Sequence, residues 1–289
     1  MKNGGNGRIH GKPVVLAGAL DTLRLHPVHA DDPLKLNSRA ARLEETPPRE
    51  PLTAATEALL DRLAALQDAF HADGRQALLL VLQGRDASGK DGVIKTVYGA
   101  FNPTGVSVAA FGPPTPYERQ HDFLWRIHQK VPVLGAIGVF NRSHYEDVLA
   151  VRVRGLAPES VWRPRFAQIN AFEKMLSENN VIVRKCFLHV SQDEQAVRLR
   201  ERLDDPRKNW KFRLEDLEDR ARWDAYTEAY RDVLRECSTK HAPWYVVPAD
   251  DKQVRNFLIA RLLVETLEAV HPQYPLMDPA VRAAAAGFR

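Results

Sequence analysis

Residues Gly84–Lys90 have the sequence GRDASGK, with the GxxxxGK spacing of a phosphate-binding loop. Glycines allow successive backbone N–H groups to converge on phosphate oxygens, and a lysine neutralises the terminal phosphates. A helix that begins at the loop adds positive potential at its N-terminus. A glycine-rich turn with a surface lysine is the alternative, but the apolar run before the loop favours a phosphate site. The residues from which we expect phosphate contacts are Gly84, Ala87, Ser88, Gly89, Lys90 and Asp91.

Two carboxylates flank the lysine of this loop. Asp91 follows Lys90 directly, at the position where phosphate loops usually carry a serine or threonine whose hydroxyl binds magnesium. Asp86 lies four residues before the lysine. Carboxylates beside a triphosphate would repel it, but they are useful where magnesium is held between carboxylate and phosphate. The pattern therefore predicts a loop that shares a magnesium ion with its substrate.

A second polar motif, FNRSHYED at residues 140–147, follows the third apolar run of the chain. Phosphate-loop folds usually place a magnesium-orienting carboxylate here, but this chain has Asn141, so Asp86 is the stronger candidate ligand. Arg142 can bind two phosphate oxygens through its planar guanidinium, with a surface ion pair as the alternative. His144 could be a general base, but the neighbouring sequence offers no orienting partner. We therefore interpret it as a structural histidine.

Basic residues gather between Arg198 and Arg213, where seven lysines or arginines and three acidic residues leave a net charge of +4. Pro206 should end a helix within this segment and let the segment fold over a site. A solvated helix face is the usual interpretation of such a charge run. The position after the fourth apolar run nevertheless matches the lid of phosphate-loop kinases of nucleoside monophosphates. We predict a hinged basic lid, with Trp210 as a packing anchor rather than a platform for a base.

The elements that must position these motifs alternate between strands and helices. Short apolar runs predict five buried strands, at Ala77–Gln83, Val106–Phe111, Val133–Phe140, Val181–Leu188 and Trp244–Val247. Helical spacing occurs at Pro51–Gly74, Tyr117–Lys130, Arg165–Glu178 and Arg222–Cys237, and in a closing helix that contains Phe257 and Leu267. Such alternation predicts an α/β fold with a parallel sheet covered on both faces.

The ends of the chain differ from this pattern. Residues 1–50 are rich in glycine, proline, asparagine and charge, and we expect a loosely ordered arm. We expect the domain to span residues 51–270, with its lid at about 198–222, followed by a tail at 271–289. The last part of this tail, Asp278–Arg289, is expected to be frayed or bound to a partner.

Composition limits the class of protein. With 289 residues, 44% hydrophobic and 27% charged, the chain has the composition of a soluble globular protein. Neither a run of roughly 18 apolar residues nor a signal peptide is evident, so we expect a cytoplasmic protein. The formal charge of +4 fits nucleic acid, a membrane surface or a small polyanion. Cys186 and Cys237 lack metal-site spacing, and we expect buried thiols.

Three ordered motifs together resemble the family-2 polyphosphate kinases. GRDASGKDG at 84–92 matches their GxDxxGKxG loop, FNRSHYED at 140–147 resembles their second motif, and DDPRKNWKF at 204–212 resembles their lid. The resemblance covers roughly residues 50–270. The second motif is similar to that of class III, whose members accept nucleoside monophosphates and diphosphates. The resemblance implies a thymidylate-kinase-like P-loop kinase, a three-layer α/β/α fold with a five-stranded parallel sheet and a helical lid.

The resemblance also implies roles for individual residues. Catalysis is expected from Asp86, Lys90, Arg142 and Arg202, and metal binding from Asp86 and Asp216. Lys208 and Lys211 of the lid are expected to bind phosphate, and Asn141, Arg142 and Glu146 to bind nucleotide. Asn141 departs from the aspartate of class I, which puts a metal role at that position in doubt.

The implied reaction is reversible, Mg²⁺-dependent phosphoryl transfer from inorganic polyphosphate to AMP or ADP, with Mn²⁺ as a substitute metal and GMP or GDP as further candidate acceptors. A homodimer or homotetramer is expected, with no nucleic-acid or membrane partner. One alternative is an ATP-dependent nucleoside-monophosphate kinase, against which Asp91 argues. A nucleic-acid-binding module is another, and it leaves the phosphate loop unexplained.

Overall fold

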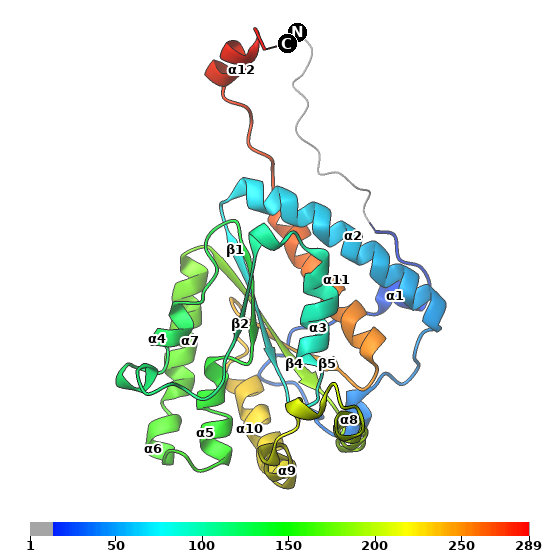
Figure 1. The fold of residues 1–289 in the computed structure, drawn as a ribbon, viewed down its shortest axis with the longest axis vertical. Helices are drawn as coiled ribbons and strands as arrows, with labels where there is room; N and C mark the ends of the chain where they lie inside the picture. The colour runs from blue at the N-terminus through cyan, green and yellow to red at the C-terminus, as the bar shows by residue number, and fades with distance from the viewer. Residues whose placement is uncertain (1–13, 289) are drawn as a thin grey trace.

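A computed structural model describes residues 14–288, and its centre is a sheet of five parallel strands (Figure 1). The strands are β1 (Ala77–Gln83), β2 (Val106–Ala110), β3 (Ile137–Asn141), β4 (Val181–His189) and β5 (Trp244–Pro248). Their order across the sheet is β2-β3-β1-β4-β5, with β1 in the middle. All seven residues of β1 are buried, as expected for a strand that helices cover on both faces.

Helices cover each face of the sheet with a separate hydrophobic core. On one face, α2 (Arg49–Asp73), α3 (Lys90–Val97) and α11 (Lys252–Val270) pack against alternate residues of β1 such as Leu80. On the other, α7 (Arg165–Glu178) and α10 (Trp223–Glu236) pack against the residues between them. The predicted three-layer α/β/α fold with a five-stranded parallel sheet is confirmed. The remaining α-helices are α1 (Ala19–Thr22), α4 (Trp125–His128), α5 (Ala150–Val153), α6 (Glu159–Trp162), α8 (Gln192–Asp204), α9 (Leu214–Ala221) and α12 (Pro279–Ala285).

Residues 14–48 have little regular secondary structure, yet they are fastened to the domain. The backbone N–H of Val28 donates to the carbonyl of Trp244 at 2.8 Å. The buried guanidinium of Arg261 donates to the carbonyl of Leu20 at 2.7 Å. The structure thus differs from the expected loosely ordered arm over these residues, because the anchoring contacts join positions more than 200 residues apart. The rest of the predicted arm, residues 1–13, lies outside the described residues.

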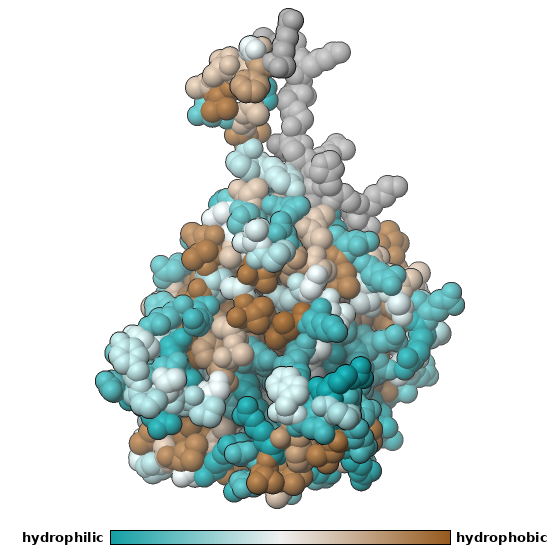
Figure 2. Space-filling view, viewed as in Figure 1, coloured by the Kyte–Doolittle hydropathy of each residue, from teal (hydrophilic) through white to brown (hydrophobic). Residues whose placement is uncertain are grey.

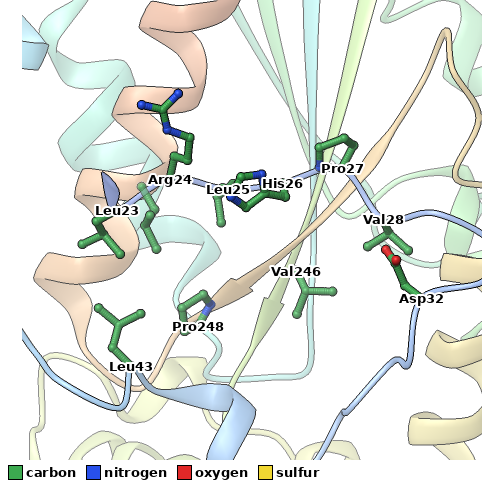
Figure 3. A pocket seen from close by; sticks show the side chains of 11 residues that line it. Leu23, Arg24, Leu25, His26, Pro27, Val28, Asp32, Leu43, Val246 and Pro248 are labelled. Atoms are coloured by element: carbon green, nitrogen blue, oxygen red, sulfur yellow. The ribbon is translucent and has the colours of Figure 1, made fainter. Parts of the chain in front are cut away.

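A cavity of about 300 Å³ lies between this N-terminal segment and the edge of the sheet (Figure 3). Its lining combines Leu23 and Leu25 of the segment with Val246 of β5 and Leu258 of α11. No phosphate-loop residue lines it. It is therefore separate from the site that the motifs predict.

Two predicted elements are shorter than expected. The helix expected at Tyr117–Lys130 is reduced to α4 and a 3₁₀ turn at Glu118–Gln120, because the Asp122 carboxylate accepts from the N–H of Leu124 and forms a local turn. The strand expected at Val133–Phe140 begins only at Ile137. Gly135, with φ of 81°, makes a turn before it.

The C-terminal segment extends away from the domain (Figure 1). It carries apolar surface at the top of the space-filling view (Figure 2), where Leu276, Met277 and Val281 are exposed. Cys186 and Cys237 are both free and buried, as predicted. Within residues 14–288, no helix is both long enough and apolar enough to cross a membrane.

Candidate active site

The loop between β1 and α3 requires glycine at two positions. A β-carbon on Gly84 would lie 2.6 Å from Oγ of Ser88 and 2.8 Å from the carbonyl of Leu188. Gly89 has φ of 101°, and a β-carbon there would collide with the guanidinium of Arg255. The glycines of the GxxxxGK pattern thus let the loop pack tightly against Ser88, Leu188 and Arg255.

Lys90 begins α3 and is buried within its own loop. Its ammonium donates to the carbonyls of Gly84 at 2.7 Å and Arg85 at 3.3 Å. Burial lowers the pKa of Lys90 to about 8. In the loop, the buried hydroxyl of Ser88 has no hydrogen-bond partner among residues 14–288, and Ala87 has a positive φ of 60°. These groups are arranged to receive an anion that would satisfy the hydroxyl and stabilise the ammonium.

The second motif meets the loop because β3 lies beside β1, with Asn141 in register with Leu82. The next residue, Arg142, has φ of 62°, and its guanidinium forms an ion pair with Asp86 at 2.5 Å. A second ion pair joins Arg142 to Glu146 at 3.5 Å. Burial would raise the pKa of Asp86, but the positive charges of Arg142 and Lys90 outweigh it and lower that pKa. The charge of Glu146 raises the pKa of Arg142. Arg142 and Asp86 therefore both stay ionised.

Asp216 of α9 approaches the same place from the lid. Burial, together with the negative charge of Asp86, raises the pKa of Asp216 to about 6, while Arg202 forms an ion pair with it at 3.5 Å. Two carboxylates that repel each other suit a shared divalent cation, and hard oxygen donors fit Mg²⁺. Among the described residues, no three His, Cys, Asp or Glu side chains form a complete metal site. Phosphate oxygens and water would therefore supply the remaining ligands.

The lid reaches the phosphate loop through one of its two predicted phosphate-binding lysines. Lys211 donates to Asp91 at 3.0 Å, and the side-chain amide of Asn141 donates to the other oxygen of Asp91 at 2.9 Å. Lys208 instead pairs with Asp205 at 3.0 Å, within the lid itself. The structure thus brings Lys211, Asp91 and Asn141 together, whereas Lys208 contacts Asp205 within the lid.

Trp210 does not pack as the sequence predicted. Its side chain is 74% exposed, on a short 3₁₀ turn, and its indole N–H donates to the carbonyl of Arg207 at 3.0 Å. The ammonium of Lys211 lies 5.2 Å from the ring centroid. The prediction that Trp210 is a packing anchor is wrong, because its ring is exposed to solvent.

Arg198 is not an exposed cation of the lid either. Its buried guanidinium donates to the carbonyls of Ala87 and Ser88 in the phosphate loop, at 3.0 and 3.2 Å. It also donates to the carbonyls of Ala249 and Asp250, at 2.7 Å each. The sequence analysis predicted that this arginine belongs to the basic lid. In the structure its guanidinium instead links the phosphate loop to the end of β5 by hydrogen bonds.

Comparison with known proteins agrees with this geometry. The family model described as polyphosphate kinase 2 (PPK2) matches residues 49–275. The chain belongs to the PPK2 family. It is 53% identical, over 219 residues, to the AMP/ADP-polyphosphate phosphotransferase of Meiothermus ruber, covering 76% of this chain and 82% of that protein.

Two further relatives support membership of the PPK2 family. An ADP-polyphosphate phosphotransferase of Rhodopseudomonas palustris is 44% identical over 235 residues, which are 77% of this chain and 81% of the relative. The crystal structure of polyphosphate kinase 2 from Arthrobacter aurescens superimposes with a TM-score of 0.79 at 41% identity. That alignment covers 88% of this chain and 89% of the solved chain.

The cleft of this PPK2 protein includes residues that sequence reasoning missed. Arg85 stacks on the ring of Trp223 at 3.9 Å and donates to the hydroxyl of Thr227 at 2.6 Å, which fixes the loop to α10. Tyr226 and Tyr230 of α10 line a cleft with the phosphate loop. No local motif marks these residues, since helical spacing alone indicates only that α10 has a buried face.

Arg154 and Asp219 form a second connection between this PPK2 core and its lid. The guanidinium of Arg154, after α5, donates to both carboxylate oxygens of Asp219 on α9, at 2.9 and 2.5 Å. Asp219 lines the cleft with Asp86 and Arg142. The sequence offered no signal for this pair, because its members lie 65 residues apart.

A buried ionic cluster supports the second motif of the PPK2 protein. Glu173 accepts from His144 at 3.2 Å and from the hydroxyl of Tyr145 at 2.9 Å. Lys185 forms an ion pair with the same carboxylate and donates to the carbonyl of Cys237 at 2.6 Å. The structural interpretation of His144 is confirmed, with Glu173 as the partner that the neighbouring sequence did not reveal.

Proposed function

We propose that this protein transfers phosphoryl groups from inorganic polyphosphate to AMP and to ADP, yielding ADP and ATP. The observation that carries the proposal is the meeting of Lys90, Arg142 and Asp86 at the carboxyl ends of β1 and β3, with the basic lid alongside. The named activities of the Meiothermus and Rhodopseudomonas relatives support polyphosphate as donor and adenine nucleotides as acceptors. Their two names also support both acceptors, AMP and ADP.

The residues of the chain act mainly by position and charge. Phosphate-loop N–H groups and Lys90 would bind the donor phosphates, while Arg142 and Arg202 would neutralise charge on the transferring group. Because the second pKa of a phosphate monoester is about 6, the attacking oxygen is already ionised at neutral pH. Asp86 is therefore proposed to orient Arg142 and the metal, without abstracting a proton.

Magnesium fits the donor set of this site. Asp86 and Asp216 would hold the ion, which would neutralise charge on phosphate oxygens of donor and acceptor. Mn²⁺ prefers the same oxygen ligands and is a proposed substitute. Asn141 is proposed to bind nucleotide rather than metal, since its amide nitrogen donates to Asp91. Glu146 is proposed as a nucleotide contact through its pairing with Arg142.

The test is incubation with polyphosphate, Mg²⁺ and either AMP or ADP, without ATP, followed by chromatographic separation of the nucleotides. We expect ADP and ATP from the first acceptor and ATP from the second, and loss of both products for Lys90→Ala. A parallel reaction with ATP as donor and AMP as acceptor tests the nucleoside-monophosphate kinase alternative. Turnover with ATP but not with polyphosphate would refute the proposal.

Assembly into a homodimer or homotetramer also stays a proposal. The exposed apolar side chains of the C-terminal segment, among them Leu276 and Val281, are consistent with a contact between copies. Light scattering coupled to size-exclusion chromatography measures the mass directly. A mass near 33 kDa, that of one 32.6 kDa chain, would contradict the proposed assembly.

A further inference from the structure

One ion pair joins the tip of the lid, residues 206–212, to the phosphate loop. Among the described residues, Lys211 donates to Asp91 at 3.0 Å, and the hydrogen bonds and ion pairs of Arg207, Lys208 and Trp210 stay within the lid. For example, Arg207 and Lys208 both pair with Asp205. The polar connection between the tip and the phosphate loop is therefore an exposed ion pair.

Asp91 is well placed to act as an anchor. It lies in the first turn of α3, directly after Lys90, where the helix N-terminus favours a negative charge. The amide of Asn141 holds one carboxylate oxygen at 2.9 Å, so that the other is directed to Lys211. Burial would raise the pKa of Asp91, but hydrogen bonds from Lys211 and Asn141 outweigh it and keep that pKa low. The carboxylate is thus an ionised, oriented anion between the phosphate loop and the lid.

A polyphosphate chain bound along the loop would compete with this anion. Lys211 cannot fully neutralise a phosphate unit while its ammonium is paired with Asp91. The negative charge of Asp91, whose side chain is 64% exposed to solvent, would also repel the incoming phosphates. Asp91, the residue that replaces the usual serine or threonine, is therefore matched to the lid lysine, and each of its two oxygens accepts a hydrogen bond from a nitrogen donor.

We propose that Asp91 is a latch that imitates a phosphate: it holds Lys211 beside the phosphate loop and yields it to polyphosphate, and so sets the affinity for the donor. The proposal rests on the proposed function, in which polyphosphate lies between the loop and the lid. Only ionic partners are exchanged, and no bond is made or broken. Asp91 is thereby a residue that tunes donor affinity and positions the lid, distinct from the proposed metal carboxylates Asp86 and Asp216.

Steady-state kinetics of Asp91→Asn test the latch. Removing the competing charge should lower the KM for polyphosphate by about three- to tenfold at low salt, a range typical of an exposed ion pair plus lost repulsion. The KM for ADP should stay unchanged. In the Lys211→Met background the same substitution should lose most of its effect, because the two residues act as a pair. Glu215→Gln is the matched control, since it removes one exposed negative charge from the lid outside the latch.

Two results would overturn the latch. One is a polyphosphate KM for Asp91→Asn that differs from the wild type no more than that of Glu215→Gln. The other is a lower kcat together with a higher Mg²⁺ concentration at half-maximal rate, which would make Asp91 a metal ligand.

Calorimetric titration of the same variants with polyphosphate separates this proposal from the proposed function. If the wild type binds polyphosphate without transferring phosphate, the function fails, while tighter binding by Asp91→Asn still supports the latch. Equal binding by both proteins refutes the latch whatever the activity.

Discussion

Replacing Arg198 with methionine should destabilise the whole protein, because this arginine joins the phosphate loop to the end of β5 by hydrogen bonds. The substitution would remove the buried guanidinium that donates hydrogen bonds to four backbone carbonyls, those of Ala87, Ser88, Ala249 and Asp250. At about 1 kcal/mol for each lost hydrogen bond, the free energy of unfolding should fall by roughly 4 kcal/mol. A change of 1 kcal/mol shifts the Tm of a domain of this size by about 2–4 °C, so Tm should fall by roughly 10 °C.

Thermal unfolding, followed by circular dichroism or calorimetry, measures this loss. Arg198→Lys should recover part of the stability, since an ammonium can reach some of the carbonyls but lacks the fork of the guanidinium. Arg200→Met is the matched control, because Arg200 lies on the same helix and is exposed. It should change Tm by less than about 2 °C, as is usual for an exposed site.

The opposite pattern would refute this reasoning. If Arg198 were a solvent-facing cation of the lid, Arg198→Met would leave Tm unchanged and raise only the KM for polyphosphate. An unchanged Tm would show that the carbonyls of the loop and of β5 do not depend on the guanidinium, whatever happens to the activity.

Three further predictions concern the site and its support. Asp86→Asn and Asp216→Asn should each lower kcat by at least about a hundredfold, which rate assays across Mg²⁺ concentrations check. In thermal melts, Tm should stay or rise for Asp216→Asn, because a carboxylate that Asp86 repels is removed, and should fall for Asp86→Asn, because the ion pair with Arg142 is lost. The pKa of Lys90 in the folded protein is about 8, below its value in the unfolded chain, so the ammonium loses its proton as pH rises through 8. The kcat/KM for polyphosphate should therefore fall above pH 8. A flat pH profile of kcat/KM would contradict this prediction. Lys185→Met should cost roughly 3–5 kcal/mol in urea unfolding, because the buried Glu173 carboxylate loses its lysine counter-charge and keeps only its contacts with His144 and Tyr145. A Glu173→Gln second change should restore part of this stability, and equal stability of the single and double variants would contradict the prediction.

Much of the architecture follows from local patterns. The apolar runs around the phosphate loop predicted five strands, and the structure has one at each of the five places. Periodicity reports secondary structure because the backbone hydrogen bonds of helices and the alternation of strands repeat over a few residues. Where a local turn competes, as at Asp122 and Gly135, the same reasoning predicted elements that were too long.

The sequence by itself determined that a phosphate loop with Asp86 and Lys90 follows a central strand, and that Arg142 follows a neighbouring one. Parallel strands end at the same edge of a sheet, so spacing along the chain sufficed to bring these motifs together. Only the tertiary structure decided which basic residues of the lid segment face solvent. Arg198 and Lys211 belong to the same charge run, but one is buried against Ala87 and the other holds an exposed carboxylate. Those partners lie 111 and 120 residues away, and a contact at such separation depends on how the elements pack rather than on the residues beside it.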